Sequence, residues 1–99
     1  MLIVHSHHGV PIRLTDERWQ HIVSRHPEML DRREQVVETV ADPEMIQEGD
    51  FGALLAVRSL LPSKFLVVAY RETSTEDGFV LTAYLTNHPS ARRAIKWKR

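Results

Sequence analysis

The segment Phe79-Val80-Leu81-Thr82-Ala83-Tyr84-Leu85-Thr86 carries the clearest two-residue alternation of side chains in the chain. Side chains along a β-strand point alternately to the two faces of a sheet, so this segment is predicted to be a strand. Its odd-numbered residues are all apolar and are expected to face the helices of the fold. Its even-numbered residues include Thr82, Tyr84 and Thr86, so the opposite face is expected to carry three hydroxyl groups.

Three other strand-like segments lie before it and predict the rest of the sheet. They are Met45 to Gln47, Phe51 to Leu60 and Lys64 to Arg71, with turns at Glu48-Gly49-Asp50 and Pro62-Ser63 and a polar loop over 72–78. Strands joined by such short connections pair as antiparallel neighbours. We therefore expect a four-stranded antiparallel meander.

Two segments nearer the N-terminus are predicted to be helices. The first runs from about Asp16 to Arg25, with Thr15 as its N-cap, and Pro27 disfavours a helical conformation for the residue before it. The second is expected from about Leu30 to Ala41, before an Asp-Pro pair. Two helices followed by a run of strands are typical of an α+β fold. Both helices are expected to pack on one face of the sheet.

The length of 99 residues predicts one domain over residues 1–99. The chain has no cysteine, which excludes disulfides and thiolate metal sites. Leu2 to Val4 is too short for a signal peptide or a membrane span, so we expect no membrane association and a cytoplasmic location. Together with residues 10–14, this segment is expected to form a hairpin at the edge of the sheet.

The formal net charge is zero, but the last 13 residues hold five basic side chains and no acidic one. A basic end on an acidic body favours a polyanionic partner, with Arg92 and Arg93 as candidate contacts. The alternative interpretation is a solubilising tail.

Two histidines at the end of the first predicted helix are the candidates for proton transfer, because the charge of histidine changes near neutral pH. His26 shares one helix face with Trp19 and Ile22, whereas His21 lies about 140° around the helix from it. This geometry makes His26 the stronger candidate. The alternatives are a core or capping histidine at position 26 and a surface histidine at position 21.

Lys64 opens one predicted strand and Arg58 lies near the end of another, so both are expected at the same end of the sheet. Two cations there could hold a phosphoryl group, or could be basic residues at the solvent boundary. The hydroxyls of Thr82, Tyr84 and Thr86 could donate hydrogen bonds, or reflect only the strand propensity of threonine and tyrosine.

The sequence offers weak candidates for a metal site. His5, His7 and His8 have no interleaved carboxylate, and the spacing of His21 and His26 differs from the i, i+4 spacing typical of a helical metal pair. A histidine metal site is therefore a third hypothesis only, and no metal or cofactor is expected.

Several short motifs, taken in order, resemble a known family. They are Ile12-Arg13-Leu14-Thr15, His21-Ile22, His26-Pro27-Glu28, Val37-Glu38-Thr39-Val40, Asp42-Pro43-Glu44, Lys64 to Val68 and Asp77 to Thr86. Together they are similar to the small phage-associated nuclease-like domains of the barnase–EndoU–colicin–RelE superfamily. The resemblance covers residues from about 10 to 97, and its most specific parts are the H-I-x-x-x-H-P-E and T-A-Y segments.

The resemblance implies metal-independent cleavage of RNA through a 2′,3′-cyclic phosphate. It implies that His26 and His21 act as acid and base, that Lys64 and Arg58 clamp the phosphate, and that hydroxyls of the last predicted strand orient it. The leading hypothesis is therefore an endoribonuclease that acts as a toxin or mobile-element effector, with RNA as substrate and a cognate antitoxin or immunity protein as partner. The alternative is a non-catalytic module on the same fold that binds nucleic acid or protein.

Overall fold

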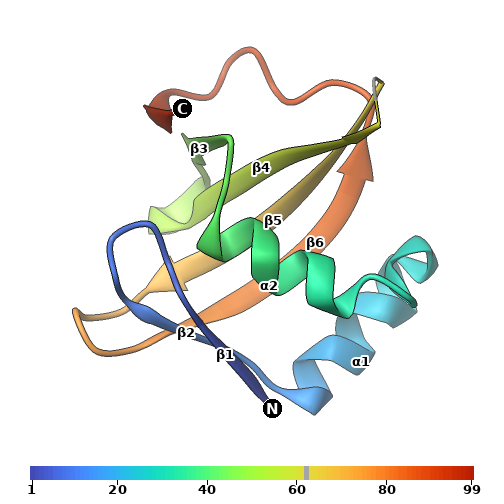
Figure 1. The fold of residues 1–99 in the computed structure, drawn as a ribbon, viewed down its shortest axis with the longest axis vertical. Helices are drawn as coiled ribbons and strands as arrows, with labels where there is room; N and C mark the ends of the chain where they lie inside the picture. Colours follow the sequence, from blue (N-terminus) through green and yellow to red (C-terminus); the bar gives the residue numbers. More distant parts are fainter. Residues whose placement is uncertain (62) are drawn as a thin grey trace.

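The chain folds as an α+β structure in which two α-helices pack against one mixed sheet (Figure 1). The structure, a computed structural model, describes residues 1–61 and 63–99; Pro62, in a predicted turn, lies outside the described residues. The helical elements are α1 (Asp16–Arg25), η1 (Pro27–Met29), α2 (Arg33–Ala41) and η2 (Asp50–Gly52). The strands are β1 (Leu2–His5), β2 (Pro11–Leu14), β3 (Met45–Glu48), β4 (Leu54–Leu61), β5 (Lys64–Glu72), β6 (Gly78–Thr86) and β7 (Ile95–Lys98).

The sheet is larger than the predicted four-stranded meander. Within the described part of the chain it has seven strands in the order β1-β2-β6-β5-β4-β3-β7. The predicted strands form its antiparallel centre, from β3 to β6. The expected hairpin, β1 and β2, joins this centre by parallel pairing of β2 with β6, and β7 pairs with β3 at the other edge. The α+β prediction is confirmed, whereas the prediction of a purely antiparallel four-stranded sheet is wrong in its strand number and in the β2–β6 pairing.

Glycine at position 78 permits the parallel junction between β2 and β6. Ile12 and Arg13 register with Gly78 and Phe79, and the Arg13 guanidinium forms a two-point hydrogen-bonded pair with the carboxylate of Asp77. A Cβ atom on Gly78 would lie 2.5 Å from the carbonyl oxygen of Arg71 and 2.6 Å from Ile12 Cδ1. Only a residue without a side chain fits between Arg71 of β5 and Ile12 of β2 as they stand.

The first helix begins and ends near the predicted residues. The Arg18 amide donates to Thr15 Oγ1 at 3.1 Å, as an N-cap requires. Helix α2 starts at Arg33, three residues later than predicted, because a 3-10 helix over Pro27–Met29 is followed by a turn at residues 30–31. In Figure 1, α2 crosses the front of the sheet and α1 lies beside β6. None of the helices in the described residues has the length and apolar character needed to cross a membrane.

The two faces of the sheet have separate apolar clusters. The face under the helices carries the larger cluster, which includes Ile22, Val36, Leu66, Val68 and Tyr70. The opposite face, here called the open face, has a smaller cluster of Leu55, Val57, Val67 and Ala69, with Phe65, Leu81 and Tyr84 packed against it. The helices therefore stabilise one face and leave the other available to a ligand.

A β-bulge in β6 changes the predicted facing of its first half. Thr82 registers with Ala69 but Val80 registers with Tyr70, so Leu81 is the extra residue. As a result Val80 is buried under the helices and Leu81 packs in the cluster of the open face. The expectation for Val80 and Leu81 is therefore wrong, whereas Ala83 lies under the helices as predicted.

The buried hydroxyl of Tyr70 gives a prediction about stability. The side chain is fully buried, and its oxygen has no hydrogen-bond partner among the described residues. Burial, with a smaller contribution from the charge of Glu72, raises the pKa of this hydroxyl. Because an unpaired buried hydroxyl costs about 1–3 kcal/mol, Tyr70→Phe is expected to leave the free energy of unfolding unchanged or to raise it by about 1 kcal/mol.

Urea denaturation of Tyr70→Phe checks this expectation, with Tyr84→Phe on the half-buried open face as a control for the loss of a tyrosine hydroxyl. A loss of more than about 1 kcal/mol in Tyr70→Phe alone would show that the hydroxyl has a partner, such as a buried water.

Candidate functional site

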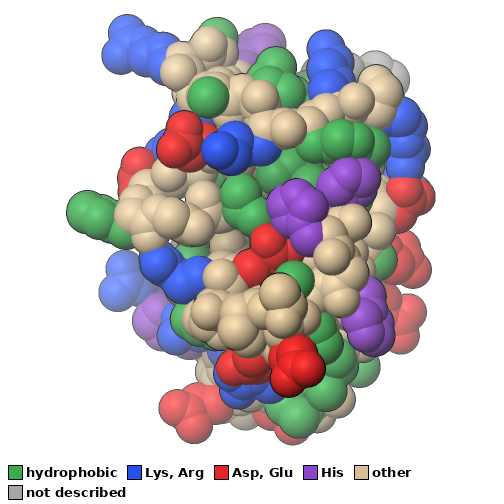
Figure 2. Space-filling view, turned by 90° about the vertical axis from the view of Figure 1, so that its left-hand side faces the viewer, with side chains coloured by type: hydrophobic (Ala, Val, Ile, Leu, Met, Phe, Trp, Pro, Cys, Tyr) green, Lys and Arg blue, Asp and Glu red, His purple; other side chains and the backbone are tan. Residues whose placement is uncertain are grey.

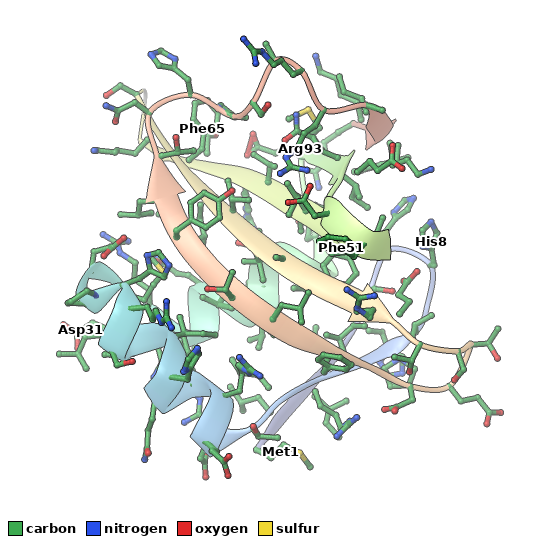
Figure 3. The ribbon with its side chains drawn as sticks, turned by 180° about the vertical axis from the view of Figure 1, so that it is seen from behind. Met1, His8, Asp31, Phe51, Phe65 and Arg93 are labelled. Atoms are coloured by element: carbon green, nitrogen blue, oxygen red, sulfur yellow. The ribbon has the colours of Figure 1, made fainter. Side chains whose placement is uncertain are left out.

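The open face of the sheet is bordered on two sides. Figure 3 shows it from behind the view of Figure 1, with α1 along the edge at β6 and the segment between β6 and β7 crossing its upper end. That segment is fastened to the sheet, because Gln47 Nε2 donates to the carbonyl oxygen of Ser90 at 2.7 Å. Helix α1 reaches the edge because β2 pairs only with the first two residues of β6. The rest of that edge contacts α1, and the Arg18 guanidinium lies 3.4 Å from the carbonyl oxygen of Leu81.

A pocket of about 300 Å³ lies where the open face meets this C-terminal segment. Leu55 and Val67 give it an apolar floor. Its polar lining comes from two elements that are distant in sequence, β3 and the end of β6 with the following segment. These polar residues are Gln47, Tyr84, Thr86, His88, Ser90 and Arg93. An apolar floor with a convergent polar rim is the usual form of a ligand site.

His26 does not line this pocket, but the way α1 ends places it near Tyr84, which does. Its amide donates to the carbonyl oxygen of Ile22 at 2.7 Å, and Pro27 follows, so the chain leaves the helix with His26 at φ −133° and ψ 77°. The imidazole is about one-third exposed, at 33%. Its ring centroid is 6.0 Å from that of Tyr84, and Nδ1 is 3.8 Å from a Glu28 carboxylate oxygen. A titratable ring thus lies near the aromatic ring of Tyr84 on the open face.

Arg93 is oriented by an acidic residue from a different part of the chain. Its guanidinium donates to Asp50 Oδ1 at 3.1 Å and to the carbonyl oxygen of Glu48 at 3.3 Å. The Asp50 carboxylate raises the pKa of Arg93, with a smaller contribution from Tyr84, and Arg93 in turn lowers the pKa of Asp50. The guanidinium therefore stays charged and fixed at the rim of the pocket.

The other residues of β6 have separate roles. Thr86 lines the pocket, but its hydroxyl donates to the carbonyl oxygen of His88 at 3.0 Å and so also shapes the turn. Thr82 registers with Ala69, which places it on the open face as predicted. Sequence reasoning missed His88, although its position in the basic end, directly after the Thr86 strand, was the available signal.

The structure does not bring Arg58 and Lys64 together with the hydroxyls. Arg58 registers with Leu66, whose side chain is in the cluster under the helices, so Arg58 faces that side. It lies 4.0 Å from Asp42 Oδ2. Lys64 lines a different cavity, with Gln35 of α2 and Arg32 just before it. The predicted clamp is therefore on the opposite side of the sheet from Tyr84.

His21 and Arg92 also lie outside the pocket. His21 is exposed and lines a separate shallow cavity with Thr15 and Arg18. Arg92 is exposed, and only its backbone amide is tied down, to Ser90 Oγ at 3.2 Å. Of the expected pair of catalytic histidines only His26 lies near Tyr84, and His88 is the histidine that lines the pocket.

Two of the N-terminal histidines, His7 and His8, lie side by side, with ring centroids 5.6 Å apart. Figure 2 shows histidine side chains gathered on the side of the molecule that carries the β1–β2 turn. The His7 ring packs on Trp97 with centroids 4.2 Å apart, and His8 Nδ1 lies 2.9 Å from the Glu72 carboxylate. Among residues 1–61 and 63–99, no three histidine, cysteine, aspartate or glutamate side chains converge as a metal site requires.

Comparison of the chain with protein-family models, with curated proteins and with solved structures found no match.

Proposed function

We propose that the protein is an endoribonuclease whose active site is the open face of the sheet. The observation that carries this proposal is the position of Tyr84, whose ring lies 6.0 Å from that of His26 and which also lines the pocket with Arg93 and His88. RNA cleavage by the ribose 2′-hydroxyl needs a base, an acid and groups that stabilise charge on the phosphoryl oxygens, and two imidazoles, a guanidinium and a phenol can supply them. The resemblance to the barnase–EndoU–colicin–RelE superfamily supports the same activity.

In the proposed reaction, His26 takes the proton of the 2′-hydroxyl, and the 2′-oxygen forms a bond to the adjacent phosphorus. Arg93 stabilises the additional negative charge on the phosphoryl oxygens, and the Tyr84 hydroxyl donates a hydrogen bond to one of them. The bond from phosphorus to the 5′-oxygen breaks, and His88 supplies the proton to that leaving oxygen. The products are a 2′,3′-cyclic phosphate and a free 5′-hydroxyl, so atoms and charge balance without a metal ion.

The cellular role extends the proposal. We infer that such an enzyme acts in the cytoplasm as a toxin or mobile-element effector and is held inactive by a cognate antitoxin or immunity protein. This part is supported only by the family resemblance.

A second candidate function is a non-catalytic module that binds nucleic acid or protein. Arg93 and Thr86 both form hydrogen bonds within the protein. A purely structural role would explain these bonds, and this observation favours the second function. In that case the basic side chains near the C-terminus bind the polyanion, and affinity falls steeply with salt concentration.

Cleavage of a mixed set of labelled RNAs in EDTA separates these functions. The wild-type protein is expected to cut the RNAs and to leave the same sequences uncut when every ribose carries a 2′-O-methyl group. If the unmodified RNAs also remain intact at every protein concentration, the catalytic proposal is rejected. Salt-dependent binding without cleavage would then support the second function.

A further inference from the structure

The turn between β3 and β4 holds an aromatic side chain out in water. Phe51 is 92% exposed and has φ 53° and ψ 42°, a left-handed conformation that bulky residues rarely adopt. The next residue, Gly52, has φ 81°. This conformation explains why β4 starts at Leu54 and not at Phe51 as predicted. Strained and exposed positions of this kind persist where the surrounding structure holds them, and they gather at functional sites.

Two arginines hold the turn from either side. Arg71 Nη1 donates to the carbonyl oxygen of Phe51 at 2.5 Å, and Arg93 forms its ion pair with Asp50, the residue before Phe51. Arg71 follows Tyr70 on β5, so it faces the open side of the sheet. Arg93 also lines the pocket with Tyr84. The turn is thus fixed to the rim of the proposed active site, and Figure 3 shows Phe51 and Arg93 on neighbouring parts of that rim.

We propose that Phe51 stacks on a nucleobase of single-stranded RNA that extends from the pocket, an inference that rests on the proposed function. The exposed aromatic ring offers a flat surface for a base, and the Arg71 guanidinium, which donates to the carbonyl oxygen of Phe51, offers positive charge for an adjoining phosphate. A protein-binding hot spot would be expected within an apolar patch, but the neighbours of Phe51 in the turn are Asp50 and a glycine. Base stacking accepts any base, so Phe51 contributes to affinity more than to sequence preference.

The binding of a fluorescein-labelled, single-stranded 12-nucleotide RNA tests this inference. The RNA carries 2′-O-methyl groups throughout, so that it binds without being cut, and affinity is measured by fluorescence anisotropy. Phe51→Leu is expected to weaken binding about 10-fold to 100-fold, because leucine keeps the bulk but loses the π-face. Phe51→Trp is expected to bind at least as tightly as wild type, and its additional indole fluorescence should be quenched by the RNA.

Ile3→Ala is the matched control, since Ile3 is also exposed, at 56%, but lies on β1 at the far edge of the sheet. It is expected to bind like wild type. If wild type cuts and binds RNA but Phe51→Leu binds equally well, the stacking inference is overturned while the proposed function stands. If Phe51→Leu loses only the capture of a protein partner, Phe51 belongs to a protein interface and the inference is again overturned. If wild type neither binds nor cuts RNA, the proposed function itself fails.

Discussion

His26→Ala is expected to lower the rate of RNA cleavage by about 10²-fold to 10⁴-fold, the range typical for loss of a general base. The variant should fold, because the side chain is one-third exposed and the backbone bonds of His26 to Ile22 and Met29 do not involve the imidazole. Affinity for a 2′-O-methyl RNA should change by only a few-fold, since Arg93 and Phe51 remain in place. The loss is therefore expected in the cleavage step and not in binding.

His21→Ala is the control for this experiment. His21 lies on the same helix but is exposed and lines a different cavity, so its removal is expected to leave the cleavage rate within about two-fold of wild type. Single-turnover cleavage with both variants measures the difference. Equal rates for His26→Ala and wild type, or an equally large loss in His21→Ala, would contradict the role assigned to His26.

Gly78→Ala is expected to lower the free energy of unfolding by about 2–4 kcal/mol, the largest stability effect that we predict. The added Cβ would meet the Arg71 carbonyl oxygen at 2.5 Å, and a backbone oxygen within the sheet cannot move away as a flexible side chain could. For a domain of this size, such a loss corresponds to a fall in Tm of roughly 10–20 °C. The parallel pairing of β2 with β6 should be the first contact to open.

Gly9→Ala separates a steric clash from backbone strain. Gly9 has φ 83°, but a Cβ there would meet no atom within 4 Å, so alanine should cost only about 1 kcal/mol. Thermal unfolding of the two variants checks the comparison. If Gly78→Ala is no more destabilised than Gly9→Ala, the close packing of β2 on β6 is not as described.

Local signals in the sequence were sufficient for α1 and for the centre of the sheet. Thr15 and Pro27 act within one turn of the residues that they cap or stop, so the end of α1 and the position of His26 could be predicted. The bulge at Leu81 could not be predicted, because it depends on how β6 registers with β5. Strand β7 was missed for a similar reason. In Ile95–Lys98, apolar residues alternate with lysines over only two pairs. The segment becomes a strand by pairing with β3, about fifty residues earlier in the chain.

In the candidate site too, features set by local sequence could be predicted, whereas features set by distant contacts could not. The hydroxyls of Thr82, Tyr84 and Thr86 were found from the alternation of one strand, and two of them line the pocket. The face of Arg58 depends on its register with Leu66 across the β4–β5 pair, which no local pattern reveals. Arg93 becomes a pocket residue through its pairing with Asp50, a contact over 43 positions. Charge distribution alone could only mark it as part of a basic end.

Mass spectrometry of the fragments that the wild-type protein forms from a synthetic RNA in EDTA tests the central claim most directly. If the open face catalyses attack by the 2′-oxygen, one fragment ends in a 2′,3′-cyclic phosphate, the other begins with a 5′-hydroxyl, and His26→Ala forms neither at a comparable rate. An intact RNA at every protein concentration would contradict the claim. So would fragments with a 5′-phosphate and a 3′-hydroxyl, because they arise from attack by water and not by the ribose.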